Sequence, residues 1–367
     1  MRSSVVLMIR TRGLTKDFAR GDRTVHAVQG LDLDIAAGEL VAVLGPNGAG
    51  KSTSMRMLTT LIAPTAGRAE VGGHDVVTEA AAVRRTIGYV GQGNGAGHNQ
   101  RVRDELRTQG AVFGLDRHTA RRRADELLEA LDLTALAGRK VSSLSGGQRR
   151  RLDVAIGLVH APLILFLDEP STGLDPQNRA NLWSHVLRMR AEHAMTVVLT
   201  THYMDEADAM AERVVVVDHG RIIADDTADR LKADLAGDRV VLTSPEAVRL
   251  AALARRWLAQ ATGGGAGSAS GRATASADGR AAAFAGGRSA APADGRAAAR
   301  DVTVEGRRVE VRVPDGPRAL PVLLAAAQTE GVPVETAQVH RPTLDDVFLT
   351  LTGRSLREAA TSERSAA

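Results

Sequence analysis

A nine-residue segment, GPNGAGKST at positions 45–53, constrains the fold of this 367-residue chain more than any other feature. It matches the phosphate-loop pattern GxxxxGK[ST], follows the apolar run Leu40–Leu44 and precedes the helix-compatible stretch Thr53–Leu61. The motif needs this order of strand, loop and helix, because the glycines let backbone N–H groups surround a phosphate at a helix N-terminus. We therefore predict a nucleotide-binding loop formed by Gly45, Pro46, Asn47, Gly48, Ala49, Gly50, Lys51, Ser52 and Thr53.

Two residues of this loop carry side-chain chemistry. Lys51 would bring its charge to the β and γ phosphates, and the Ser52 hydroxyl would be a ligand of Mg²⁺. The alternative is a glycine-rich turn that matches the pattern by chance. The chain has only four lysines, so a chance match at the lysine position is rare.

A second apolar run, Ile164–Leu167, ends in the carboxylates Asp168 and Glu169. A buried strand that delivers an aspartate at its C-terminal edge can hold Mg²⁺, directly or through water. The following glutamate would lie beside the γ phosphate and accept a proton from the attacking water. Alone, the pair could be the solvated end of a strand, but together with the phosphate loop it indicates a hydrolytic site.

The segment Leu144–Gln148, with the sequence LSGGQ, is the third motif. Ser145 fits a helix N-cap, Gly146 and Gly147 permit close backbone approach, and a helix is predicted over Arg149–His160. By itself this could be an ordinary capped turn. With the other two motifs it indicates a second helix end that faces phosphate.

Together, these motifs resemble the Walker A, signature and Walker B segments of the nucleotide-binding subunits of ABC transporters. The resemblance covers residues 10–235 and implies an α/β fold of the P-loop NTPase type. Three further residues complete the family pattern in the expected order: Gln92 of the Q-loop, Asp175 of the D-loop and His202 of the switch.

The resemblance implies a catalytic group of Lys51, Glu169, His202 and Gln92. Glu169 would be the general base, and His202 would orient the γ phosphate and the water. The implied Mg²⁺ ligands are Ser52, Asp168 and Gln92.

The resemblance also implies partners. Two copies of the chain would pair head to tail, so that Ser145 and Gly147 contact the γ phosphate of ATP bound to the other subunit. Gln92 would couple hydrolysis to an integral-membrane permease. This arrangement places the chain at the cytoplasmic side of the cell membrane as a peripheral protein.

Two positions leave alternatives open. Phe18 aligns with the aromatic residue that stacks on adenine in the family, but it could instead be a core phenylalanine. The segment Gly91–Gly97, which contains Gln92, is richer in glycine than the family pattern. We expect Gln92 to keep its role and the local chain to be unusually mobile.

Composition divides the chain into an ATP-binding domain (1–235), an accessory domain (236–262 plus 301–353), an insertion (263–300) and a tail (354–367). In the insertion, 24 of 38 residues are Ala or Gly, so it buries too little apolar surface to order itself and is predicted to be disordered. The alternative is that the insertion binds RNA, but the insertion lacks the interleaved aromatic residues that stack on bases. The accessory segments predict the order βαββαβ of a small ferredoxin-like domain.

In the accessory domain, strands are expected at Arg239–Thr243, Asp301–Glu305, Arg308–Val313 and Val332–His340. Helices are expected at Ser244–Gln260 and Pro317–Glu330, and a final helical turn or two at Asp345–Thr352. Ser244, before Pro245, would cap the first of these helices.

Three segments indicate a subfamily: Met57–Ile62, Val71–Val77 and Pro342–Gly353. With the accessory domain, they resemble daunorubicin-resistance-type ATP-binding subunits, which implies export of a small hydrophobic drug or antibiotic-like molecule through the permease. Two other classes compete. A soluble ABC ATPase of translation or DNA repair would carry two cassettes or a long coiled coil, and a module that binds ATP without turnover would not need Glu169 and His202.

The composition of the chain excludes or disfavours several other classes of protein. The chain has no cysteine, which excludes a disulfide scaffold and cysteine-ligated metal sites. It has no run of about 18 apolar residues, so no membrane-spanning helix is predicted. The insertion has five Arg and two Asp, which supplies three of the four net positive charges, so the basic balance does not indicate nucleic-acid binding.

Overall fold

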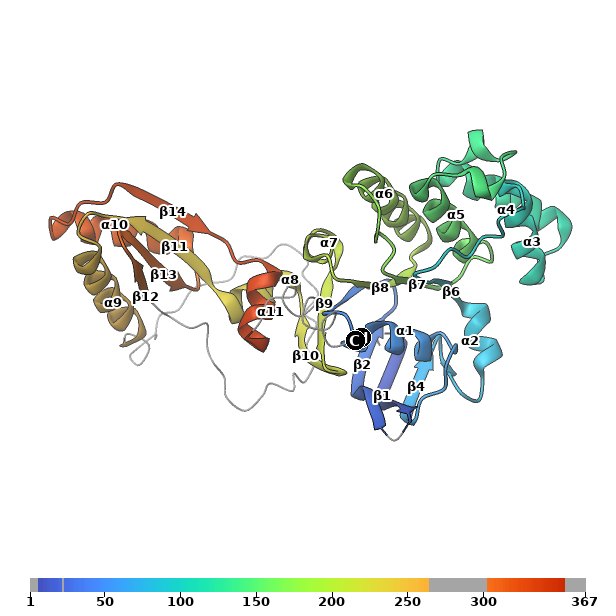
Figure 1. The fold of residues 1–367 in the computed structure, drawn as a ribbon, viewed down its shortest axis with the longest axis horizontal. Coiled ribbons are helices and arrows are strands. Elements are labelled where there is room, and N and C mark those ends of the chain that lie inside the picture. Colours follow the sequence, from blue (N-terminus) through green and yellow to red (C-terminus); the bar gives the residue numbers. More distant parts are fainter. Residues whose placement is uncertain (1–5, 22, 264–301, 354–367) are drawn as a thin grey trace, which may run out of the picture. The chain divides into compact units, whose positions relative to one another are not determined.

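The computed structural model describes residues 6–21, 23–263 and 302–353, which form two compact units that divide between Ala228 and Asp229. Figure 1 shows both units, and the first carries all the predicted site residues. The predicted insertion lies outside the described residues, apart from Gly263 at the end of a helix, and so does the predicted tail at 354–367.

A six-stranded sheet in the order β10-β9-β3-β8-β7-β6 is the centre of the first unit. Only β10, at one edge, is antiparallel to its neighbour, so the expected parallel α/β sheet is confirmed. Every residue of β3, β7 and β8 is buried, as in strands that are covered on both faces. The strands are β3 Leu40–Leu44, β6 Ile87–Val90, β7 Ile164–Asp168, β8 Thr196–Thr201, β9 Arg213–Asp218 and β10 Arg221–Asp226.

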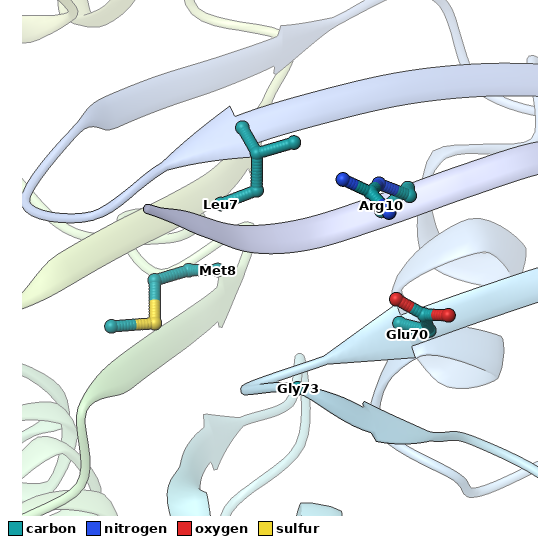
Figure 2. A pocket seen from close by; sticks show the side chains of 5 residues that line it. All are labelled: Leu7, Met8, Arg10, Glu70 and Gly73. Carbon is teal, nitrogen blue, oxygen red and sulfur yellow. The ribbon is translucent and has the colours of Figure 1, made fainter. Parts of the chain in front are cut away.

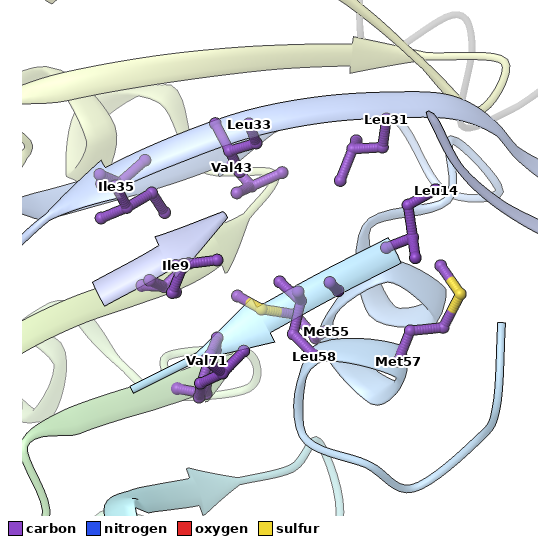
Figure 3. Close-up of a cluster of buried hydrophobic side chains, with 14 of the residues drawn as sticks. Ile9, Leu14, Leu31, Leu33, Ile35, Val43, Met55, Met57, Leu58 and Val71 are labelled. Atoms are coloured by element: carbon purple, nitrogen blue, oxygen red, sulfur yellow. The ribbon is translucent and has the colours of Figure 1, made fainter. Parts of the chain in front are cut away.

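A four-stranded antiparallel sheet, which the sequence analysis did not predict, packs on the phosphate-loop side. Its order is β2-β1-β4-β5, with β1 Leu7–Arg20, β2 Arg23–Ala36, β4 Ala66–Val71 and β5 His74–Asp75. Ile9 and Leu33 of this sheet join Val43 of β3 and Met55 of helix α1 (Lys51–Leu58) in one buried cluster (Figure 3). The cluster holds α1, and with it the phosphate loop, between the two sheets.

The remaining helices of the first unit lie between strands: the first of them joins β5 to β6, and the others connect strands of the parallel sheet. They are α2 Ala80–Thr86, α3 Val102–Val112, α4 Arg117–Ala130, α5 Gly146–Leu158, α6 Pro176–His193 and α7 Met204–Met210. Between β6 and β7, helices α3, α4 and α5 pack on one another, with single 3₁₀ turns at Thr134–Leu136 and Val141–Ser143. Helix α5 also contacts β6, so it joins this helical group to the sheet.

The second unit contains a four-stranded antiparallel sheet in the order β12-β13-β11-β14. After α8 (Ala228–Leu231) and a π-helical turn (Lys232–Ala236), its elements follow in the predicted order βαββαβ, and α11 ends the described chain. They are β11 Asp238–Thr243, α9 Ala247–Gly263, β12 Val302–Glu305, β13 Arg308–Val313, α10 Gly316–Thr329, β14 Thr336–His340 and α11 Leu344–Thr352. Because β13 lies between β11 and β12, the arrangement is compatible with the expected ferredoxin-like domain.

Helix α9 and strand β14 of the second unit both begin later in the chain than expected. Helix α9 begins at Ala247 and not at Ser244. The Ser244 hydroxyl accepts the Glu246 amide at 3.0 Å, so it closes a turn around Pro245 before the helix starts. Strand β14 begins at Thr336, because Val332 packs into the core of the unit at the end of the turn after α10.

Candidate functional site

The phosphate loop passes through a narrow space between β3 and α1. Gly50 has a φ of 100°, and a Cβ atom there would lie 2.5 Å from the Ala27 carbonyl oxygen of β2. A Cβ atom on Gly45 would lie 2.2 Å from the Val217 carbonyl oxygen of β9. Both positions therefore require glycine for the loop to keep this path, whatever ligand it binds.

Lys51 is buried in the first turn of α1, with 5% of its surface exposed. Its Nζ donates to the carbonyl oxygens of Gly45 at 2.7 Å and Pro46 at 2.9 Å, and it lies 3.6 Å from Glu169 Oε1. These acceptors offset the cost of burying the ammonium group. Phosphate oxygens of a bound nucleotide are acceptors of the same kind.

The three predicted Mg²⁺ ligands lie together. Ser52 Oγ donates to Asp168 Oδ1 at 2.9 Å, and Gln92 Nε2 donates to Ser52 Oγ at 3.1 Å. The other carboxylate oxygen of Asp168, Oδ2, is buried and has no hydrogen-bond partner among the described residues. A hydroxyl, a carboxylate and an amide oxygen are hard donors of the kind that Mg²⁺ prefers, so these residues fit the ion.

Glu169 follows Asp168 at the end of β7 with a φ of 47°, a left-handed conformation that is uncommon for a residue with a side chain. Its Oε2 lies 3.5 Å from His202 Nδ1, and Thr172 Oγ1 donates to the same oxygen at 3.4 Å. The contact with His202 holds the pKa of Glu169 below its usual value; burial opposes this effect and the Lys51 charge adds to it. A carboxylate that stays ionised in this way can accept a proton from water.

The signature segment forms the N-terminus of α5. Ser145 Oγ accepts the Gln148 amide and the Gln148 side chain accepts the Ser145 amide, which is a capping box. The two glycines differ, because a Cβ atom on Gly147 would lie 2.5 Å from Asn178 Oδ1, whereas Gly146 faces open space. Packing within this chain alone therefore explains why residue 147 is glycine.

The D-loop residue Asp175 caps α6. Its Oδ1 accepts the Asn178 amide at 2.9 Å, and its Oδ2 accepts the Asn178 side-chain amide. Asn178 is also the residue that contacts Gly147, so the D-loop and signature segments lie next to each other within one chain.

The Gln92 segment is anchored to α5, which argues against the mobility expected of it. Arg150 Nη1 donates to the Gly91 carbonyl oxygen at 2.7 Å. At the other end of the segment, Asp153 Oδ1 accepts the backbone amides of Gly95 at 3.0 Å and Ala96 at 3.2 Å. The backbone of the glycine-rich segment is thus held in place by hydrogen bonds to two buried charged side chains, Arg150 and Asp153.

Sequence reasoning missed three polar residues around the site. Arg150 also donates to the carbonyl oxygens of Pro170 and Asp168, at 2.7 and 3.3 Å. Asp153 and Thr200 are the other two, and Thr200 donates to Asp168 Oδ1. The available signals were a single carboxylate, Asp153, in the apolar part of α5 and a polar residue at the end of an apolar strand; Arg150 stands in a run of three arginines that does not single it out.

Phe18 is not a core residue. Its surface is 41% exposed, and its neighbour across the β1–β2 pair, Val25, is 47% exposed. Lys16 Nζ lies 5.2 Å from the centre of the Phe18 ring. An exposed ring of this kind is able to stack on a flat ligand, so stacking on adenine stays a prediction.

A cavity of about 140 Å³ is lined by residues of β1 and β4, the two inner strands of the antiparallel sheet, and by Gly73 (Figure 2). Its lining residues are Leu7, Met8, Arg10, Glu70 and Gly73, and none of them belongs to the predicted site. No helix in the described part of the chain is both long enough and apolar enough to cross a membrane.

Comparison with known proteins agrees with this geometry. The chain matches the ABC transporter family over residues 28–172 and the C-terminal domain of DrrA1-3-like ATP-binding proteins over residues 286–352. It is 44% identical to the daunorubicin resistance ATP-binding protein DrrA3 of Streptomyces coeruleorubidus, over 93% of this chain and 95% of that protein. It is 31% identical to the linearmycin resistance ATP-binding protein LnrL of Bacillus subtilis, over 96% of this chain and 100% of that protein.

Among solved structures, a dimeric ATP-binding cassette in a post-hydrolysis state, bound to ADP and phosphate, matches with a TM-score of 0.56 and 26% identity. The match covers 60% of this chain and 98% of that cassette.

Proposed function

Since the chain belongs to the ATP-binding subunits of ABC transporters, in the group similar to daunorubicin resistance proteins, we propose that its ATPase activity drives export of a small hydrophobic molecule. A separate integral-membrane permease would carry that molecule. The observation that carries the ATPase part of the proposal is the convergence of Lys51, Asp168 and Glu169 at the phosphate loop, with Lys51 Nζ 3.6 Å from Glu169 Oε1.

The side chains of the phosphate loop and of the end of β7 would have different roles in ATP hydrolysis. Lys51 would bind the β and γ phosphates, and Glu169, which its lowered pKa keeps ionised, would accept a proton from the attacking water. His202 would orient that water and the γ phosphate. Ser52, Asp168 and Gln92 would hold Mg²⁺, which when bound neutralises phosphate charge.

A second copy of this chain would complete the site. Its Ser145 and Gly147 would contact the γ phosphate, with Asp175 at the same interface, and the exposure of Ser145 and Gly146 leaves this helix end accessible. The similar cassette is dimeric and bound to ADP and phosphate, which supports the same arrangement here. Phe18 would stack on adenine.

The relatives support the transport role. They are resistance and export proteins, which favours transport over a soluble role in translation or DNA repair. A permease partner would place the chain at the cytoplasmic face of the membrane, with residues 1–235 as the ATP-binding domain and the segments 236–262 and 301–353 as the accessory domain. The exported molecule would be of the drug or antibiotic type that the relatives' names indicate.

The variant Glu169→Gln tests the proposed chemistry. It should keep ATP binding and lower turnover by about 10²–10⁴-fold, because the amide cannot take the proton. ATPase assays and nucleotide titrations measure both quantities, and gel filtration with ATP should show a stabilised dimer. The exposed Glu192→Gln is the matched control, and turnover of Glu169→Gln at the wild-type rate would show that another group is the base.

Membrane vesicles that contain the chain and a candidate integral-membrane permease test the transport role. Daunorubicin uptake into inverted vesicles should depend on ATP and be lost with Glu169→Gln. ATPase activity that no hydrophobic compound stimulates in these vesicles would contradict export while leaving the ATPase assignment intact.

A further inference from the structure

Thr200 lies beside the metal-binding carboxylate although it is 32 residues away along the chain. In the parallel register of β7 and β8 it is the direct partner of Asp168, at the C-terminal edge of the sheet. Its side chain is completely buried. Its position beside Asp168 therefore follows from how β7 and β8 align.

The Thr200 hydroxyl serves both carboxylate residues at once. It donates its single proton to Asp168 Oδ1 at 2.6 Å, and it accepts the backbone amide of Glu169 at 3.0 Å. The same amide also lies 3.1 Å from the Thr200 carbonyl oxygen. Glu169 has a left-handed backbone, so these contacts hold a strained point of the chain.

The hydrogen bonds at Asp168 are unequal. Oδ1 accepts hydroxyl protons from both Ser52 and Thr200, whereas Oδ2 is buried without a partner among the described residues. Because Oδ1 accepts two hydrogen bonds, the Asp168 carboxylate cannot rotate without breaking at least one of them. Hydrogen bonds accepted by a charged carboxylate are stronger than those between neutral groups. Oδ2 is thereby kept as the oxygen that remains available to a cation.

We propose that Thr200 is a positioning residue of the ATPase site: its hydroxyl fixes the orientation in which Asp168 offers Oδ2 to Mg²⁺ and holds the backbone from which Glu169 projects. The inference rests on the proposed Mg²⁺ site at Asp168. Packing alone does not require a hydroxyl here, since the preceding residues of β8, Val197, Val198 and Leu199, are buried and apolar.

The chain offers a matched control on the same strand. Thr196 is also fully buried in β8, and its hydroxyl accepts the Gly38 amide at 2.8 Å, at the opposite end of the strand from the site. Thr196→Val therefore removes one buried hydroxyl from the same sheet without touching Asp168. Thr200→Ser keeps the hydroxyl at the site and removes only a methyl group.

The test measures Mn²⁺ and Mg²⁺ affinity of the full-length protein saturated with adenylyl imidodiphosphate, by electron paramagnetic resonance and calorimetry. Thr200→Val should weaken metal affinity by about tenfold, because second-shell partners of metal ligands have effects of that size. Thr200→Ser and Thr196→Val should keep wild-type metal affinity. Melting temperatures show whether loss of stability accounts for any difference.

Asp168→Asn separates the inference from its premise. Weak metal binding by Asp168→Asn together with wild-type binding by Thr200→Val overturns the Thr200 proposal alone. Wild-type binding by Asp168→Asn overturns the proposed metal site itself. If Thr200→Val does not fold, Thr200→Ala removes the same hydroxyl with less steric change, and the same two outcomes apply to it.

Discussion

The phosphate-loop region and the N-terminus of the signature helix α5 differ in how far their residues are buried and contacted by other residues of the same chain. Around the phosphate loop, Lys51 and Asp168 are buried and joined by contacts to neighbouring side chains or backbone. At the start of α5, Ser145 and Gly146 are exposed. The first region is assembled within the chain, whereas the second presents its capped helix end at the surface, as the proposed dimer requires.

Burial explains this difference. Charged groups out of water need partners in their own chain, and the buried groups near the loop have them. A capped helix N-terminus needs no further partner from its own chain, because Ser145 and Gln148 hydrogen-bond to each other's backbone amides. The helix end stays open to an anion. Substitutions at three positions sharpen the contrast between the two regions.

The largest effect is expected in the phosphate-loop region. Lys51→Ala should lower ATPase turnover by about 10²–10³-fold, because it removes a charge that stabilises the transferring phosphate and leaves Glu169 without its cation. Steady-state ATPase assays and nucleotide titrations measure the loss. Lys140→Ala, at an exposed lysine, should stay at the wild-type rate, and unaltered activity of Lys51→Ala would contradict the phosphate-loop assignment.

An intermediate effect is expected at the signature end. Ser145→Ala should cost about 1 kcal/mol of folding stability, because it removes an N-cap, and should reduce turnover by about tenfold. Ser145→Asp restores the cap but places a negative charge where a phosphate is expected, so stability should recover while turnover falls further. Chemical denaturation and ATPase assays at several protein concentrations separate the two effects. Full activity of Ser145→Asp would show that the helix end does not contact the nucleotide.

The smallest effect concerns pH. Because the pKa of Glu169 is lowered in the folded chain, its ionised form stabilises the fold above the usual pKa of a glutamate, and this contribution is lost as the pH falls through the lowered value. His202→Ala removes the largest cause, so acid denaturation and the acid limb of residual turnover should both move to higher pH. The exposed His193→Ala is the control, and an unmoved acid limb would show that His202 does not set this pKa.

Local sequence predicted a structural feature correctly where the residues that cause the feature are neighbours in the sequence. The glycines at 45 and 50, the cap at Ser145 and the buried runs that became β3 and β7 could all be predicted from neighbouring residues. The boundary of α9 could not, because the Ser244 hydroxyl bonds to Glu246 in a turn and not to the first turn of the helix.

Side chains that cross between elements were the main omission. Arg150 and Asp153 bind backbone groups of the Gln92 segment, which lies more than 50 residues earlier, so no local pattern specifies their partners. The glycine at 147 was attributed to phosphate approach, yet its neighbour Asn178 already excludes a side chain there.

Sequence by itself determined the chemistry available to this protein, since a lysine after a glycine-rich loop, and two carboxylates and a histidine at the ends of apolar strands, follow one another in a recognisable order. Only the tertiary structure decided which of these groups meet. The parallel register of β7 and β8 pairs Thr200 with Asp168, and within the part of the chain that the structure describes this leaves Oδ2 as the carboxylate oxygen without a hydrogen bond. Strand register is set by packing over the whole sheet, which no single segment encodes.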